Sequence, residues 1–177
     1  MRRSSIFTFA AVLALLSSGS VPRAVQAPTD AELVQRARAI HDRVIALDTH
    51  DDINPANFTA ECNYTRRLLT QFNLPKMRQG GLDVAFLNVH VPQGPLTSSA
   101  YADAYAQAVA KFDAVHRLTE QIAPKEIGLA LTPADVTRVA QSGRKVAVIG
   151  MENGYSVGTD VARVREDFPI LKQRVHG

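Results

Sequence analysis

The amino-acid sequence predicts an α/β fold built on a parallel β-sheet. Strand-like apolar segments, at residues 44–49, 82–92, 127–131 and 145–153, alternate along the chain with segments of helical periodicity. This order of elements is the one that produces parallel sheets. The strand-like segments are also apolar along nearly their whole length, which is typical of strands covered on both faces. We therefore expect a sheet with helices packed against it.

The first 27 residues are expected to be a secretory signal peptide rather than part of the fold. They begin with Arg2 and Arg3, continue with an apolar run over residues 6–16, and reach small residues before Ala27. This three-part order is typical of a cleaved leader, and the apolar run is too short to span a bilayer. We expect an exported protein, periplasmic or secreted, with one domain over residues 28–177.

The charge of the chain argues against a nucleic-acid partner. The whole sequence has 20 Lys and Arg against 17 Asp and Glu, but three of the basic residues belong to the predicted leader. The remaining chain has 17 of each sign, so it lacks the basic excess that binding to phosphates requires. We expect no nucleic-acid partner, nothing in the sequence indicates membrane association after the leader is removed, and we leave a homodimer open.

A helix is expected before each of the first two strands. Residues 30–43 place apolar side chains at helical spacing ahead of the strand at 44–49. Residues 73–81 contain a proline that suits a first helical turn and two glycines that suit a helix end. The strand at 82–92 follows at once and ends at Pro92.

The second half of the chain continues this alternation. Residues 98–122 carry apolar side chains at steps of three and four, which makes this the most clearly predicted helix of the chain. A short strand follows at 127–131, and Thr132 then provides a helix cap ahead of the strand at 145–153. A last helix is expected to begin at 159–166.

Polar side chains follow three of the predicted strands. Because the carboxyl ends of parallel strands meet at one edge of a sheet, where α/β folds place their chemistry, we expect these side chains to converge. The three polar strand ends are Asp48-Thr49-His50-Asp51-Asp52, Asn88-Val89-His90 and Glu152-Asn153.

The first of these strand ends contains a candidate metal-binding pair. Side chains alternate along a strand, so Asp48, His50 and Asp52 are expected on one face and Asp51 on the other. An imidazole and a carboxylate two residues apart can chelate one cation, and Glu152 could bind the same ion or bridge to a second. Mixed nitrogen and oxygen ligands suit zinc and also allow manganese or cobalt. The alternative is a chance pair of solvated loop residues.

The other histidines carry weaker expectations. His90, at a strand end, either lines the same pocket or is a structural residue whose hydrogen bonds are satisfied. His41 and His116 lie in helical segments and are expected at the surface.

Three stretches of the sequence together resemble one known family. They are ALDTHDDIN (46–54), FNLPKMRQGGLDVAFLNVHVP (72–92) and VAVIGMENGYSVGTDVARVRE (146–166), and they look like the membrane (renal-type) dipeptidases, metallopeptidases of the M19 group. The resemblance implies a (β/α)8 TIM-type barrel with two zinc ions that hydrolyses the peptide bond of dipeptides through a metal-activated hydroxide. It also implies that His50 and Asp52 bind one metal and that Glu152 bridges both.

The chain departs from the family pattern in two places. It has Glu152-Asn153-Gly154-Tyr155 where many members have Glu-Gly-Gly-His. The resemblance also assigns no residue here to two further histidine ligands, an arginine for the substrate carboxylate and a late aspartate. We therefore expect the N-terminal portion of a barrel, truncated by a frameshift or premature stop, with little activity alone. The alternatives are a non-catalytic exported remnant and a related metal-dependent hydrolase of lactams, cyclic imides or esters.

Overall fold

The computed structural model describes residues 27–160 and 162–164. The predicted signal peptide therefore lies outside the described residues apart from Ala27, and the helix predicted from 159–166 lies partly outside them. Within the described part of the chain, no helix has both the length and the apolar character needed to cross a membrane.

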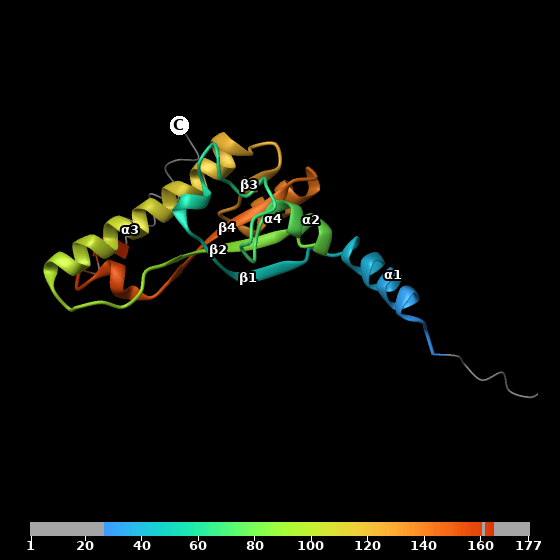
Figure 1. The fold of residues 1–177 in the computed structure, drawn as a ribbon, viewed down its shortest axis with the longest axis horizontal. Coiled ribbons are helices and arrows are strands. Elements are labelled where there is room, and N and C mark those ends of the chain that lie inside the picture. The colour runs from blue at the N-terminus through green and yellow to red at the C-terminus, as the bar shows by residue number, and fades with distance from the viewer. Residues whose placement is uncertain (1–26, 161, 165–177) are drawn as a thin grey trace, which may run out of the picture.

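Four parallel strands form a single sheet in the order β1-β2-β4-β3 (Figure 1). The central pair is in continuous register, from Val84 opposite Val146 to His90 opposite Glu152. The strand β3 pairs only with the first three residues of β4. The predicted α/β class with a parallel sheet is thus confirmed. The strands are β1 (Leu47–Asp52), β2 (Val84–His90), β3 (Ile127–Leu129) and β4 (Lys145–Glu152).

The helices agree with the sequence-based expectations to within a few residues at their ends. The predicted cap Thr132 accepts a hydrogen bond from the backbone N–H of Asp135, and the Asp135 carboxylate accepts one from the N–H of Thr132. This reciprocal arrangement fixes the start of α4. The helices are α1 (Asp30–His41), α2 (Leu74–Gly80), α3 (Ser98–Arg117), which continues as a π-helical turn over Leu118–Ile122, and α4 (Pro133–Gln141).

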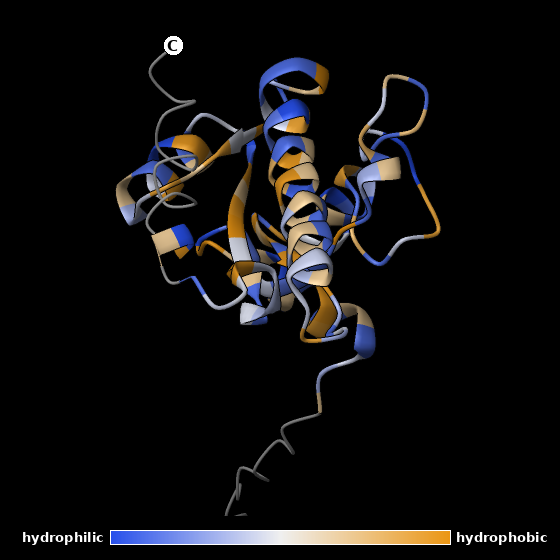
Figure 2. Cartoon of the chain, turned by 90° about the vertical axis from the view of Figure 1, so that its left-hand side faces the viewer, coloured by the Kyte–Doolittle hydropathy of each residue, from blue (hydrophilic) through white to orange (hydrophobic). Residues whose placement is uncertain are grey.

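The core lies on both faces of the central strands. On one face, Leu87 belongs to an apolar cluster with Val115 of α3. On the other, Val84 and Val146 form a smaller cluster with Val139 of α4. The helices carry both hydrophilic and hydrophobic residues (Figure 2), and α3 and α4 cover the sheet with one side and face water with the other. Burial on both faces explains why β2 and β4 read as apolar runs.

The prediction of a buried first strand over residues 44–49 is wrong. The strand β1 runs instead from Leu47 to Asp52 and is exposed at every position except Asp51. Val44 and Ile45 precede the strand and are exposed. Among the described elements β1 has β2 as its only neighbour in the sheet, and α1 extends away from the sheet with none of its described residues buried (Figure 1). An edge strand without a covering helix cannot bury both faces.

The alternation expected along β1 is interrupted by a bulge. Asp48 lies opposite Ala85, but Asp51, three residues later, lies opposite Leu87, only two residues later. Because a bulge changes the direction of the side chains that follow it, Asp48 does not share the face of His50 and Asp52 that strict alternation predicts. The Asp48 carboxylate instead accepts a hydrogen bond from the backbone N–H of His50 at 3.0 Å.

Asp51 is the one residue of β1 that points into the protein. It is 7 % exposed, and its Oδ2 atom has no hydrogen-bond partner within the described part of the chain. Burial, helped by the nearby charge of Asp48, raises the pKa of Asp51 to about 6. The pKa of Tyr64 is also raised, chiefly by its own burial and further by the charge of Asp51. The Asp51 charge is therefore unfavourable in the folded protein.

We predict that Asp51→Asn makes the metal-free protein more stable at pH 7. The folded pKa of Asp51 is above its ordinary value, so the stability associated with the protonated carboxyl is present below pH 4 and is lost as pH rises through 6. Asparagine cannot ionise, and the variant should gain about 1 kcal/mol in its free energy of unfolding at pH 7. Urea denaturation with EDTA at pH 4 and pH 7 measures this gain.

Asp135→Asn is the matched control with the opposite sign. Hydrogen bonds from Arg138 and Thr132 lower the pKa of Asp135 to about 2, so its charge favours the folded state. The control should lose stability at pH 7 and change less at low pH. If Asp51→Asn differs from the wild type by the same amount at both pH values, the buried charge is not the cause.

Candidate metal centre

The carboxyl ends of β1 and β4 bring three potential metal ligands together. His50 and Asp52 come from β1, and Glu152 is the last residue of β4. The His50 Nε2 atom lies 3.1 Å from Glu152 Oε2 and 3.6 Å from Asp52 Oδ1. One ligand atom from each residue lies within 4.8 Å of the other two. These are the same three residues that the sequence singled out.

The strand between them sets the spacing of the group. Within the sheet β2 separates β1 from β4, with Asn88 opposite both Asp52 and Gly150. Asn88 is 5 % exposed, and a Cβ atom at Gly150 would lie 2.2 Å from its Oδ1. The Asn88 amide occupies the space that a side chain at position 150 would need, so only glycine fits there. A glycine inside a strand often marks such a close approach. Gly150 was therefore the one sequence feature that could have indicated the contact with Asn88.

The three side chains suit a divalent cation. They offer one imidazole nitrogen and two carboxylate groups, a mixture that zinc, manganese and cobalt accept. Two carboxylates that meet at one point repel each other unless a positive charge lies between them. The side chains of His50, Asp52 and Glu152 are 53 %, 64 % and 47 % exposed, so an ion held there would remain open to water and to a substrate.

The remaining histidines of the described chain differ in their surroundings. His90 is half-buried and lies opposite Glu152 in the register, but it does not belong to the ligand group. His41 is exposed, as expected. The expectation of a surface position for His116 is wrong, because it is 2 % exposed on the packed side of α3. Its Nδ1 atom lies 2.6 Å from Glu120 Oε1.

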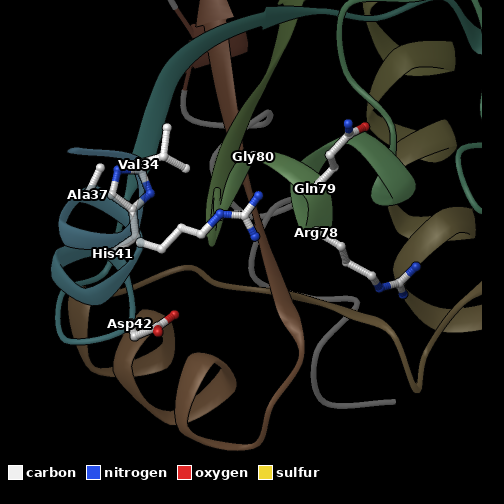
Figure 3. A pocket seen from close by; sticks show the side chains of 9 residues that line it. Val34, Ala37, His41, Asp42, Arg78, Gln79 and Gly80 are labelled. Carbon is white, nitrogen blue, oxygen red and sulfur yellow. The ribbon is translucent and has the colours of Figure 1, made fainter. Parts of the chain in front are cut away.

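A hollow of about 380 Å³ lies between α1 and α2, away from the metal-ligand group. Its lining includes His41, Asp42 and Arg78 (Figure 3). Both helices lead into the amino ends of β1 and β2, whereas the three candidate ligands lie at the carboxyl ends of β1 and β4. Arg78 pairs with Glu126 at 2.5 Å. The hollow is therefore separate from the candidate metal centre.

Comparison with known proteins identifies relatives of this chain. The sequence model of the membrane dipeptidases (peptidase family M19) matches residues 34–168. A dipeptidase of Aspergillus terreus, ataJ, is 28 % identical over 142 residues, which are 73 % of this chain and 34 % of that protein. The chain thus spans about a third of the length of this curated relative.

Two solved structures share the fold. The probable dipeptidase PvdM from Pseudomonas aeruginosa gives a TM-score of 0.71 at 22 % identity, covering 80 % of this chain and 36 % of that one. A second structure, described as the metallopeptidase dipeptidase AC, gives a TM-score of 0.56 at 22 % identity, covering 72 % and 40 %. The predicted fold class, a parallel α/β arrangement that corresponds to part of a (β/α)8 barrel, is confirmed by these matches.

The family match includes both strand ends that carry the ligand group, since it extends from before β1 to beyond β4. On this evidence the chain belongs to the membrane dipeptidase family, peptidase family M19.

Proposed function

We propose that His50, Asp52 and Glu152 bind zinc as part of a site that hydrolyses the peptide bond of dipeptides. The observation that carries this proposal is the meeting of one nitrogen and two oxygen ligand atoms within 4.8 Å at the carboxyl ends of β1 and β4. Family membership supplies the dipeptide as the substrate class.

Each of the three residues has a distinct part in this proposal. His50 and Asp52, from one strand, bind the first ion. Glu152 faces His50 from another strand and is proposed to bridge to a second ion. The Nε2 atom of His50 faces both carboxylates, so it serves as the ligand atom and Nδ1 carries the proton. Bound zinc would polarise the scissile carbonyl and lower the pKa of the attacking water.

The backbone of β1 helps to direct the His50 ligand. The bulge after Asp48 frees the Asp48 carboxylate to accept the N–H of His50, which restrains the backbone beside the imidazole. Asp51 points into the protein and does not compete for the ion. The site is therefore built from alternate side chains of one short exposed strand and one carboxylate from β4.

The activity of the isolated chain is expected to be low. The family resemblance implies two further histidine ligands, an arginine and an aspartate, and it assigns none of them to these 177 residues. We propose that residues 28–177 bind metal but turn dipeptides over slowly. We also propose that the protein is exported and that residues 1–27 are removed as a signal peptide.

We predict that the purified wild-type chain binds zinc and that His50→Ala and Glu152→Gln each abolish tight binding. Each variant removes one ligand of the group and leaves too few to hold the ion. Isothermal titration calorimetry, together with the metal content after gel filtration, measures the effect.

His41→Ala is the control for these variants, because it removes an exposed histidine outside the ligand group and should bind like the wild type. A wild-type chain that takes up no zinc would favour the non-catalytic remnant over the metal site.

We predict that residues 28–177 loaded with zinc hydrolyse dipeptides far below the typical enzyme rate of about 10 per second. A stopped assay of amino-acid release checks this, and His50→Ala should remove whatever turnover remains. Turnover near the typical rate would contradict the prediction of low activity. Faster hydrolysis of a lactam, a cyclic imide or an ester in the same assay would favour the related hydrolase.

A further inference from the structure

The turn that follows Glu152 has an unusual backbone conformation. Asn153 has φ +70° and ψ 121°, and it is the only non-glycine residue with a positive φ among the described residues. A side chain makes this conformation unfavourable, so it persists only where surrounding contacts compensate for it. Glycine would adopt it without this cost. The contacts of the asparagine side chain are therefore the ones to examine for this compensation.

The Asn153 side chain connects the turn to the end of the neighbouring strand. Its Nδ2 group donates a hydrogen bond to the carbonyl of Val91 at 3.0 Å. Its Oδ1 atom accepts one from the backbone N–H of Tyr155 at 2.9 Å. One amide thus joins the residue after β2 to the turn after β4.

Tyr155 makes a second connection between the same two segments. Tyr155 is 7 % exposed, and its hydroxyl donates a hydrogen bond to the carbonyl of Pro95 at 2.8 Å. A Cβ atom at Gly94 would lie 2.7 Å from that hydroxyl oxygen, so the loop passes directly against the tyrosine. We call Asn153 and Tyr155, with their acceptor carbonyls on Val91 and Pro95, the turn clamp.

The turn clamp acts on the backbone immediately beside a proposed ligand. His90 and Glu152 lie opposite each other as the last residues of β2 and β4, and the clamp ties the two segments that follow them. The Glu152 side chain is half exposed and contacts His50, so the backbone at 152–153 determines where its carboxylate can reach.

We infer that the turn clamp positions Glu152 for metal binding, with Asn153 as the positioning residue. This inference rests on the proposed function, because it assumes that Glu152 is a ligand. The two hydrogen bonds of the Asn153 amide hold the strained turn, and the strained turn directs the Glu152 carboxylate toward His50. Asn153 itself does not contact the ion.

The test compares metal binding by the wild-type chain, Asn153→Gly and Thr132→Ala. Glycine accepts the positive φ but removes both side-chain hydrogen bonds of Asn153, so only the Asn153 part of the turn clamp is lost. Thr132→Ala removes the cap of α4, before the other end of β4, and controls for a general loss of stability. Zinc affinity is measured by competition with a chromophoric chelator, and the visible spectrum of bound cobalt(II) reports the geometry of the ligands.

We expect Asn153→Gly to weaken zinc binding about tenfold, as is typical when a residue that orients a ligand is lost, and to change the cobalt spectrum. Thr132→Ala should match the wild type in both measurements. Tyr155→Phe keeps Asn153 and removes only the hydrogen bond to Pro95. It should weaken binding in the same direction and serves as the test if Asn153→Gly does not fold.

Wild-type affinity and an unchanged cobalt spectrum in Asn153→Gly would overturn the inference while leaving the proposed function intact. Equal weakening in Thr132→Ala would overturn it as well, because the effect would then follow stability. A wild-type chain that binds neither zinc nor cobalt would overturn both the proposed function and the inference.

Discussion

The parallel pairing of β2 with its two neighbours is the constraint on which the rest of the structure depends. The register places Asn88 between Asp52 and Gly150, and the missing side chain at Gly150 provides the space that the buried amide occupies. With β1 and β4 held on either side of one strand, their carboxyl ends lie at one edge of the sheet. His50 can then meet a carboxylate from its own strand and another from β4.

The strands of the sheet differ in how deeply they are buried, and the candidate metal ligands lie on the exposed parts. The central strands β2 and β4 have apolar clusters on both faces, whereas β1 is exposed at nearly every position. A charged cluster is much less costly on an exposed strand than within a core, because its groups remain hydrated. The one carboxylate that does turn inward, Asp51, has a raised pKa for this reason. The exposed strand can therefore carry the candidate metal ligands without a large loss of stability.

The ends of the strands are more tightly organised than their exposure suggests. The Glu152 side chain is half exposed. The next residue, Asn153, nevertheless has a strained backbone conformation, and its side chain makes hydrogen bonds to Val91 and to Tyr155. Strained residues of this kind cluster at functional sites. The restraint around Glu152 agrees with the proposal that its carboxylate binds a metal ion.

Much of the architecture could be predicted from the sequence. Apolar runs and helical periodicity located the strands and helices to within a few residues, and the polar ends of the strands identified His50, Asp52 and Glu152. These signals are local, since each depends on the pattern within one element. The same patterns did not reveal that Asn88 and Gly150 fit together, because their contact joins residues 62 positions apart.

Tertiary structure decided the remaining features. The strand β1 is exposed because it lies at an edge with no helix over it, and Asp48 leaves the face of His50 because the bulge against β2 inserts a residue. His116 is buried because α3 turns that side toward the protein. The sequence by itself determined which residues are candidate metal ligands, because side-chain type and position in a strand can be read from it. Only the packing of one element against another decided which of them face each other, because burial and register depend on neighbours distant in the chain.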